Sequence, residues 1–499
     1  MAAIQPTQTQ ETSFGSSRML WQFLILGIGT LIAMGGGALI GLTQQGTWVV
    51  LGIIAVFTGI VMVIRPAFGV FVLVAFVYLN ASDIIEVQFG IPSLNKILVA
   101  LIFIGVLGTR LVIRRKPLTF RSTEALLILY GLVILISGMS GSDPSAAFTN
   151  IIDYAKDIAI VLILVQVCDT ESVWKNVQWI VMFCAAFLAL LTTYQMVTGD
   201  TSNTFYGLAN APVHQITENF DNTRPTGPLD DPNFYSQILM MVLPLCIYRA
   251  LDDAKPRNRI IGTVFSGLIA LAVIFTYSRS AFVMMAGLVF LIILERRMNV
   301  FKLVIIGTII LVAAFPLLPK GFLDRIATLG GTDELSAAGS QEASFQGRSS
   351  EMIVAVEMFL DHPIIGIGYA AYDTNYIQYS SRLGLDGRLE NREAHSLYLE
   401  AAAETGILGF ASLGLVIVFI FLNMARDRER VRLLERPDLV SWINGLQFGL
   451  LSYLLTSIFL HDGYVRYLRL SIALAVSASA FVDALARQNE EKRKKGLKV

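Results

Sequence analysis

Residues 406–424 read GILGFASLGLVIVFIFLNM, and residues 425–432, which follow directly, read ARDRERVR. The first stretch carries no charge and is long enough to cross the hydrocarbon core of a bilayer, which takes about 20 helical residues. The second stretch is rich in arginine, and short loops rich in Lys and Arg stay on the cytoplasmic side of a membrane. An apolar span that ends in a basic loop therefore indicates both a membrane-crossing helix and its orientation.

The same pattern recurs along the chain. Of its 499 residues, 55% are hydrophobic and 15% are charged, whereas about a quarter of a soluble domain is charged. We predict an all-α polytopic membrane protein with about 14 transmembrane helices, within a range of 12–14. The strands of a membrane β-barrel would be about ten residues long and would alternate in polarity, which excludes that class. The predicted spans are residues 19–41, 48–64, 67–80, 94–112, 123–139, 150–167, 176–197, 234–250, 260–276, 281–295, 301–318, 404–424, 440–460 and 465–485.

Basic residues in the short loops predict the orientation of these spans. They place both termini in the cytoplasm, with a tail at 1–18, one membrane domain at 19–485 and a basic tail at 486–499. Two long loops, 198–233 and 319–403, then lie on the outer side. The inner basic residues include Arg110, Arg114, Arg115, Lys116, Arg249, Lys255, Arg257, Arg259, Arg296, Arg297, Arg426, Arg428, Arg430, Arg432 and Arg436.

The second outer loop is predicted to be partly helical. Residues 330–347 are rich in Gly, Ser and Ala, which favours an irregular and mobile stretch. Residues 349–360 have apolar side chains at helical spacing, and Pro363 ends that helix. Residues 392–404 are predicted to form a helix that leads directly into the next span.

Four arginines of the outer side stand apart from the basic inner loops: Arg224, Arg279, Arg348 and Arg392. Guanidinium groups bind phosphate oxygens in pairs and keep their charge at any relevant pH. Each of them could instead reach lipid headgroups or pair with a local acid. For Arg279, which lies in a tight turn between two apolar helices, the functional interpretation is favoured.

His395 lies at the mouth of a span, three residues after Arg392, so on a helix the two would share a face. A neutral imidazole could accept the proton of an attacking hydroxyl at neutral pH. The alternative is a histidine at the membrane surface that only contacts water. All four histidines fall on the outer side, and His461 is assigned to an outer turn without a specific role.

Further polar residues are candidates for contact with a substrate. Asp231 and Asn233 open a helix, where capping of backbone N–H groups is the usual role. Lys156 lies within one turn of Asp153 and Asp157 near the outer start of a span. Such a cluster is either a mutually neutralised structural group or a substrate contact.

Several function classes have no support in the sequence. The formal net charge is zero, so no nucleic-acid partner is expected, and the three cysteines lack metal spacing. Walker, GxSxG, HExxH and DxD motifs are absent, which argues against enzymes that use ATP or a nucleotide sugar. We therefore expect neither a cofactor nor a metal.

Three stretches resemble the O-antigen ligase and polymerase (Wzy-like) superfamily of bacterial envelope glycosyltransferases. They are GPLDDPNF at 227–234, TYSRS at 276–280, and the stretch from Gly347 to Leu399 that contains DHPIIGIG at 361–368 and AHSLYL at 394–399. ETGILG at 404–409 continues the third stretch. The resemblance covers about residues 200–425, whereas the first six spans match only in general character.

The resemblance implies a GT-C-type, metal-independent, inverting glycosyltransferase in the bacterial inner membrane, with its active site facing the periplasm. Its donor would be a glycan linked to undecaprenyl pyrophosphate, held by Arg224, Arg279 and Arg348. His395 would orient or deprotonate the acceptor hydroxyl, on another glycan or on a lipid A core. Many members have an asparagine after that histidine, where this chain has Ser396. Partners could include the flippase and the export machinery.

Other functions remain open. The same architecture includes lipid A–core ligases, polysaccharide polymerases and protein O-oligosaccharyltransferases, and the long outer loop favours a polymerase. A small-anion transporter of the bicarbonate type is the alternative from another class, because outer arginines could attract an anion. A transporter should show internal repeats and broken helices, and no repeated half is found in the sequence. A structural scaffold of an envelope complex is a third possibility.

Overall fold

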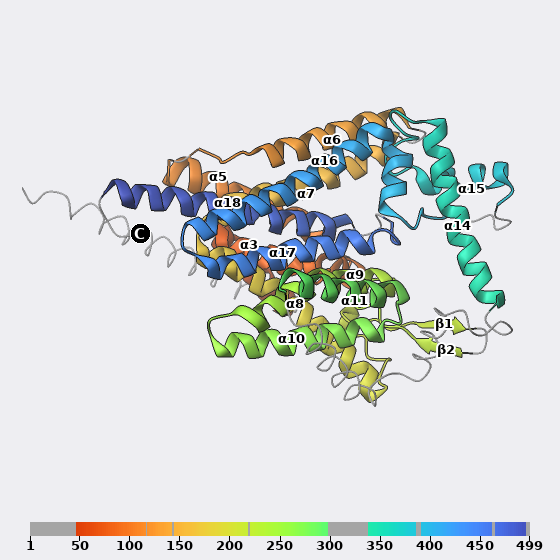
Figure 1. Cartoon of the computed structure of the whole chain (residues 1–499), viewed down its shortest axis with the longest axis horizontal. Coiled ribbons are helices and arrows are strands. Elements are labelled where there is room, and N and C mark those ends of the chain that lie inside the picture. Colours follow the sequence, from red (N-terminus) through yellow and green to blue (C-terminus); the bar gives the residue numbers. More distant parts are fainter. Residues whose placement is uncertain are drawn as a thin grey trace, which may run out of the picture.

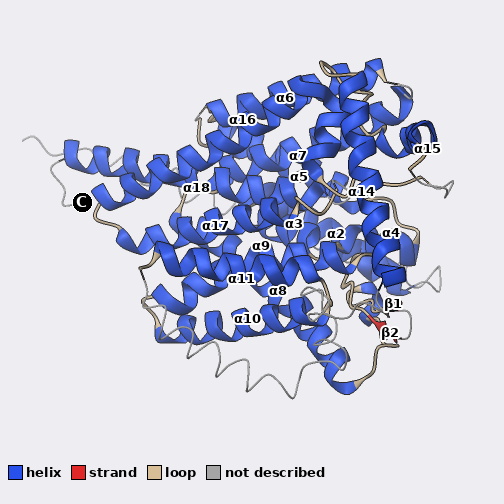
Figure 2. Cartoon of the chain, turned by 45° about the vertical axis from the view of Figure 1, so that its right-hand side comes forward, coloured by secondary structure: helices blue, strands red, loops and turns tan. Residues whose placement is uncertain are grey.

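The computed structural model describes residues 46–115, 117–141, 144–217, 220–297, 338–385, 391–461 and 465–495. Helices make up most of it, with one short hairpin of two strands (Figure 2). The helices are α2 (Gly46–Ile64), α3 (Pro66–Tyr78), α4 (Ala81–Phe89), α5 (Leu94–Leu107), η1 (Gly108–Ile113), α6 (Ser122–Ser140), α7 (Pro144–Val167), α8 (Glu171–Thr198), η2 (Phe205–Gly207), α9 (Pro232–Asp252), α10 (Pro256–Phe275), α11 (Arg279–Glu295), α14 (Ala338–Asp361), α15 (Tyr372–Leu383), α16 (Leu397–Leu433), α17 (Pro437–Thr456) and α18 (Val465–Lys494).

The prediction of a helical, multi-pass membrane protein is confirmed. Among the described residues, eight helices are long and apolar enough to cross a membrane. The number rises to nine if α3 and α4, which meet at a bend of 68°, together form one span. The count of fourteen stays a prediction, because the spans at 19–41 and 301–318 and the tail at 1–18 lie outside the described residues.

Helices α9 and α18 form the centre of the bundle, since 83% of the apolar window of each is buried. Trp174 of α8 stacks on Phe481 of α18 with ring centroids 4.6 Å apart. Tyr78 of α3 donates a hydrogen bond of 2.8 Å to the carbonyl of Ile238 in α9. These contacts join the first helices to the last ones, so the described helices share one core.

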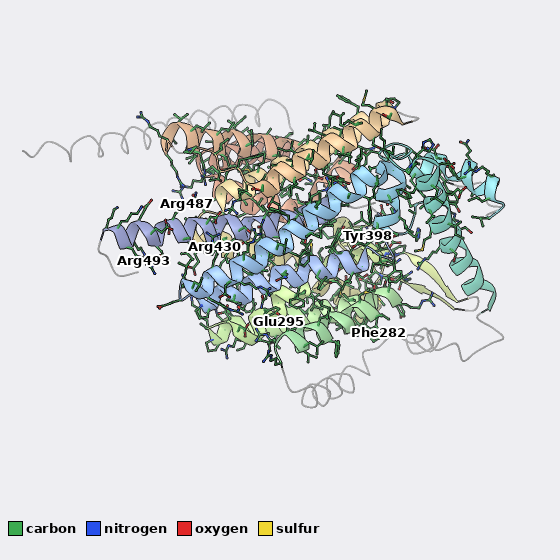
Figure 3. All side chains as sticks on the ribbon, turned by 45° about the horizontal axis from the view of Figure 1, so that its top comes forward. Phe282, Glu295, Tyr398, Arg430, Arg487 and Arg493 are labelled. Carbon is green, nitrogen blue, oxygen red and sulfur yellow. The ribbon has the colours of Figure 1, made fainter. Side chains whose placement is uncertain are left out.

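The two ends of the bundle differ in character. Helices α14 and α15 and the hairpin gather at one end, and α18 ends at the other (Figure 1). Arg430, Arg487 and Arg493 lie toward the end where α18 finishes, whereas Tyr398 lies toward α14 (Figure 3). Loop charges that were predicted to lie inside pair with one another, as Arg436 does with Glu171 at 2.9 Å.

The hairpin is the one departure from an all-helical fold within the described part of the chain. Strands β1 (Val213–Thr217) and β2 (Phe220–Thr223) pair antiparallel inside the first predicted outer loop. The pairing gives partners to the backbone groups of a loop that the sequence did not predict to be ordered.

The expectation of an irregular stretch at 330–347 is wrong for residues 338–347, which belong to α14. The Gly and Ser content suggested a loop, but Ala338, Gln341 and Glu342 are compatible with a helix. Once the following turns are packed, each added residue needs only its own hydrogen bond to extend the helix. Residues 330–337 lie outside the described residues.

Helix α16 is broken at Gly406, where the backbone has φ 61° and ψ −164°. Before the break, the carbonyl of Ala403 accepts a hydrogen bond of 3.0 Å from Ile367. After the break, the N–H of Ile407 donates to the carbonyl of Pro363 at 2.8 Å. The turn that follows α14 is thereby fastened to α16, and the first two turns of α16 are set apart from its membrane-crossing part.

We expect Gly406→Ala to destabilise the protein. A Cβ at this position would lie 2.4 Å from the carbonyl carbon of Ile364, in a backbone conformation that side chains rarely adopt. The conformational strain alone is about 1–3 kcal/mol, so the thermal midpoint in detergent should fall. Gly414→Ala is the matched control in the same helix, because its Cβ would meet no atom within 4 Å. Equal midpoints for the two variants would contradict this role of Gly406.

Candidate functional site

The stretch from Gly227 to Asn233 positions the start of α9. Oδ1 of Asp231 accepts hydrogen bonds from the backbone N–H groups of Asn233 and Phe234 at 2.6 and 3.1 Å. Pro232 occupies the first turn, where its missing N–H has no cost. Asp231 is therefore a helix cap, as its sequence context indicates, and this carboxylate oxygen is occupied by backbone donors. The side chain of Asn233 stays a candidate for substrate contact.

Three of the outer arginines surround the turn between α10 and α11. Nε of the buried Arg224 donates a hydrogen bond of 3.0 Å to the carbonyl of Thr276 in that turn. Arg279 begins α11, and Arg348 projects from α14 in the outer loop. Burial lowers the pKa of Arg279, and the nearby charge of Arg348 lowers it further. Residues far apart in sequence thus bring guanidinium groups to one place.

Arg279 and Arg348 have no carboxylate partner among the described residues, in contrast to most arginines of the structure. Two like charges that approach each other in a half-buried place are unfavourable unless an anion joins them. The turn between α10 and α11 together with α14 is therefore suited to bind an anion.

A buried carboxylate on α14 organises the other half of the site. Glu351 is 1% exposed, and its Oε1 accepts a hydrogen bond of 3.2 Å from Arg392. Its Oε2 lies 3.3 Å from Nδ1 of His395, which is also 3.2 Å from the carbonyl oxygen of Glu393. Glu351 follows Arg348 by three residues, so the two share a face of α14.

These contacts determine which nitrogen of His395 can act as a base. A proton on Nδ1 is hydrogen-bonded to the carbonyl of Glu393, and Oε2 of Glu351 lies close by without hydrogen-bond geometry. Because the partner of one ring nitrogen fixes the tautomer, Nε2 is left as the basic nitrogen. The side chain of His395 is 31% exposed, so the imidazole is only partly covered by the protein.

The prediction of a helix over residues 392–404 is wrong at its start. Residues 391–396 are not helical, His395 has a φ of 49°, and α16 begins at Leu397. The N–H of Leu397 donates to the carbonyls of Ser457 and Leu460 at 3.1 and 2.8 Å, which fixes this entry to the helix. Arg392 and His395 therefore meet at Glu351 and not on a helix face.

His461 lies beside His395, with ring centroids 5.7 Å apart. Its other neighbour is Phe234 at the start of α9, at 5.0 Å with the rings edge to face. Burial, with a smaller contribution from the neighbouring His395, lowers the pKa of His461 to about 4, and Asp231 acts in the opposite direction. His461 is therefore neutral at physiological pH, and a proton taken up by His395 meets no second charge there.

Lys156 lies in a different place. Its Nζ is 3.2 Å from Oδ1 of Asp153 and 3.8 Å from Oδ1 of Asp157, and Lys96 also reaches Asp153 at 3.4 Å. These contacts favour the neutralised cluster over a contact with an anionic substrate. Among the described residues, Lys156 makes no ion pair or hydrogen bond with Arg279, Arg348 or His395.

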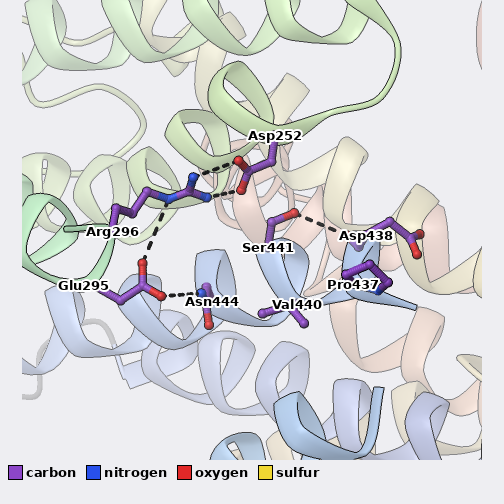
Figure 4. A pocket seen from close by; sticks show the side chains of 8 residues that line it. All are labelled: Asp252, Glu295, Arg296, Pro437, Asp438, Val440, Ser441 and Asn444. Atoms are coloured by element: carbon purple, nitrogen blue, oxygen red, sulfur yellow. Dashed lines mark hydrogen bonds and ion pairs between the residues drawn. The ribbon is translucent and has the colours of Figure 1, made fainter. Parts of the chain in front are cut away.

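A cavity of about 480 Å³ between the ends of α9, α11 and α17 has the opposite character (Figure 4). Its arginine, Arg296, is paired through both terminal nitrogens with the carboxylate of Asp252. Glu295 accepts a hydrogen bond of 3.0 Å from Asn444. No cation is left over among its lining residues to hold an anion.

Sequence reasoning missed Glu351 and the role of His461. The only signal for Glu351 was a carboxylate three residues after an outer arginine, on a helix with apolar residues at regular spacing. His461 gave no signal, because its contact with His395 arises from the packing of the loop between α17 and α18 against the start of α16.

We expect the stability of the protein to depend on pH through His461. The pKa of this group falls from 6.5 to about 4 on folding, so the unfolded chain binds a proton first as the pH falls. The stability that neutral, buried His461 contributes to the folded state is fully present above pH 6.5. It is lost as the pH falls from 6.5 to about 4. His461→Phe, which can keep the edge-to-face contact, should show a smaller fall of the thermal midpoint over this window. If the thermal midpoints of the wild type and of His461→Phe fell equally with pH over this window, His461 would not be the group responsible.

Comparisons with known proteins agree with this part of the chain. Residues 264–432 match the family model described as O-Antigen ligase. The match contains Arg279, Arg348, Glu351, Arg392 and His395, whereas Arg224, Asp231 and His461 lie outside it.

A curated relative is the "Exopolysaccharide production protein ExoQ" of Rhizobium meliloti (strain 1021), which is 27% identical over 108 residues. That match covers 20% of this chain and 25% of the relative, so it spans about a quarter of the relative's length. The resemblance to the O-antigen ligase and polymerase superfamily that the sequence indicates is thereby confirmed over residues 264–432.

Proposed function

We propose that the chain is a glycosyltransferase of the cell envelope that transfers or polymerises glycan from an undecaprenyl-pyrophosphate-linked donor onto an acceptor hydroxyl. The observation that carries the proposal is the arrangement on α14. One turn presents Arg348 toward Arg279, and the next holds His395 through Glu351. The domain matched by the family model contains all four residues.

The arginines supply what the leaving group needs. When the bond between the anomeric carbon and the pyrophosphate oxygen breaks, negative charge grows on the pyrophosphate. Arg279 and Arg348 are preorganised to receive that charge, and a well-placed donor in a partly dry site can contribute about 3 kcal/mol. Arg224 fixes the turn that carries Arg279 through its bond to Thr276. The chemistry in this account does not need a metal, because guanidinium groups carry the positive charge.

His395 acts on the acceptor. Its Nε2 accepts the proton of the attacking hydroxyl, while the new bond forms between that oxygen and the anomeric carbon. Glu351 stabilises the resulting imidazolium through Nδ1, as a carboxylate does in other histidine pairs. Because His461 is neutral, it does not repel the protonated His395. Attack opposite the leaving group inverts the anomeric centre.

The membrane arrangement belongs to the same proposal. The outer loops with α14, α15 and the hairpin face the periplasm, and the basic ends of α16 and α18 face the cytoplasm of a bacterial inner membrane. A GT-C-type enzyme uses this face because its lipid-linked donor is presented there. The similarity to an exopolysaccharide production protein supports a polymerase of an exported polysaccharide over a lipid A–core ligase.

Complementation of a deletion strain tests the function. Arg279→Ala and His395→Ala should insert at normal levels but leave lipid-linked repeat units untransferred, with loss of surface polysaccharide on gels. A general base is worth about 10²- to 10⁴-fold in rate. The controls are Arg426→Ala and His362→Ala, which remove one exposed residue of each type outside the site. Normal polysaccharide from both site variants would disprove the assignment, and anion uptake would become the next assay.

A second set of variants tests the pairing of Glu351 with His395. Glu351→Gln keeps the size of the side chain but removes the charge that stabilises protonated His395, so transfer should fall by about 10²-fold or more. Combining it with His395→Ala should cause no further loss, since residues that act as a unit are not additive. Glu357→Gln, on the same helix, is the control. Additive losses would show that Glu351 acts independently of His395.

A further inference from the structure

A second polar cavity, of about 220 Å³, lies among α4, α5, α7 and the start of α18. No described residue of the transfer mechanism or of the arginine cluster lines it, and its wall includes Lys156. Its wall carries the carboxylates of Asp83, Glu86, Asp153 and Asp157 and the cations of Lys96, Lys156 and Arg466. Such a concentration of charge beside apolar helices needs a physical reason.

The cations of this cavity are already neutralised. Lys96 and Lys156 approach the same oxygen of Asp153 at 3.4 and 3.2 Å, and Arg466 pairs with Asp83 at 2.7 Å. A phosphate would have to displace a carboxylate from each of them. The cavity is therefore unsuited to the pyrophosphate of the donor, unlike the turn that carries Arg279.

The amide of Asn95, in the wall of the cavity, has an acceptor atom without a hydrogen-bond donor among the described residues. Its side chain is 6% exposed and lines the cavity, and its Oδ1 is buried without a hydrogen-bond donor in the described structure. Buried polar groups nearly always have a partner, and an unmatched acceptor is unfavourable. The missing group is a donor, and carboxylates next to Asn95 can accept further hydrogen bonds as well.

The cavity adjoins the candidate site through two short links. Asn80, in the bend between α3 and α4, donates a hydrogen bond of 3.0 Å to the carbonyl of Pro228, which precedes the cap of α9. Its Oδ1 accepts a bond of 2.7 Å from Arg466, which lines the cavity. Arg466 follows His461 by five residues. These hydrogen bonds connect the wall of the cavity to the segment that precedes α9, and Phe234 at the start of α9 packs on His461 beside His395.

We propose that this cavity binds a sugar unit of the acceptor glycan by its hydroxyl groups. A pyranose ring offers several hydroxyls that donate to carboxylate and amide oxygens and accept from ammonium groups. That pattern matches a wall of paired carboxylates, two lysines and the orphan Oδ1 of Asn95. The inference rests on the proposed glycan transfer and assigns the subsite that holds the acceptor away from the reacting hydroxyl.

Binding of a soluble glycan to the full chain in nanodiscs tests the subsite apart from transfer. The probe is the repeat-unit oligosaccharide released by mild acid from the lipid-linked intermediate of the host strain, titrated by saturation-transfer NMR. Asn95→Ala and Glu86→Gln should each weaken its binding by about three- to tenfold, the value of one hydrogen bond. Glu86 is exposed, so its substitution leaves folding intact even if Asn95→Ala does not fold. Glu429→Gln, another exposed glutamate, should bind as the wild type does.

The outcomes separate the two proposals. Absence of binding to wild type, equal binding by both cavity variants, or competition by inorganic pyrophosphate at similar concentration would overturn the sugar subsite. Lower thermal midpoints with unchanged affinity would assign the cluster a structural role only and would likewise overturn it. Transfer is measured separately, with His395→Ala. Normal transfer by that variant would refute the catalytic proposal and leave the binding result standing.

Discussion

The buried carboxylate of Glu351 is the interaction on which the candidate site depends. A carboxylate that is 1% exposed must be paired, because the desolvation of an isolated charge is very costly. Glu351 obtains its partners from a segment 41 residues further along, where Arg392 donates to it. His395 completes the group. This requirement fastens α14 to the entry of α16 and keeps His395 in a backbone conformation that a free loop would seldom adopt.

Arginines at the two ends of the bundle have different surroundings. At the end where α18 finishes, arginines are paired with acids, as Arg296 is with Asp252 and Arg430 with Asp483. Those pairs hold loops together. Around the turn between α10 and α11, the charge of Arg348 is near enough to lower the pKa of Arg279, and neither side chain has a carboxylate partner among the described residues. In the proposed mechanism, a bound pyrophosphate relieves the mutual repulsion of the two guanidinium groups, most of all when the negative charge on the pyrophosphate grows.

The class of helical membrane proteins could be predicted from the sequence, because an apolar span and a basic loop are local patterns. The sequence also makes Arg279 a candidate for function, since a lone arginine between apolar helices is rare, and that role stays a prediction. It could not reveal Glu351, whose importance comes from contacts across more than forty residues and not from its neighbours. For the same reason the segment at 392–396 was read as a helix: composition favours one, but Leu397 is bound by the loop after α17. The hairpin and the neutralised surroundings of Lys156 are likewise products of tertiary packing.

The central claim is that the chain couples release of a polyprenyl pyrophosphate to formation of a glycosidic bond. The most direct measurement uses the purified full chain in liposomes with its lipid-linked donor, without nucleotide and with a chelator present. The account predicts that one undecaprenyl pyrophosphate is released for each glycosidic bond formed, with inversion at the anomeric carbon. Glycan transfer that requires a nucleotide or a metal ion, or a donor that stays intact under these conditions, would contradict it.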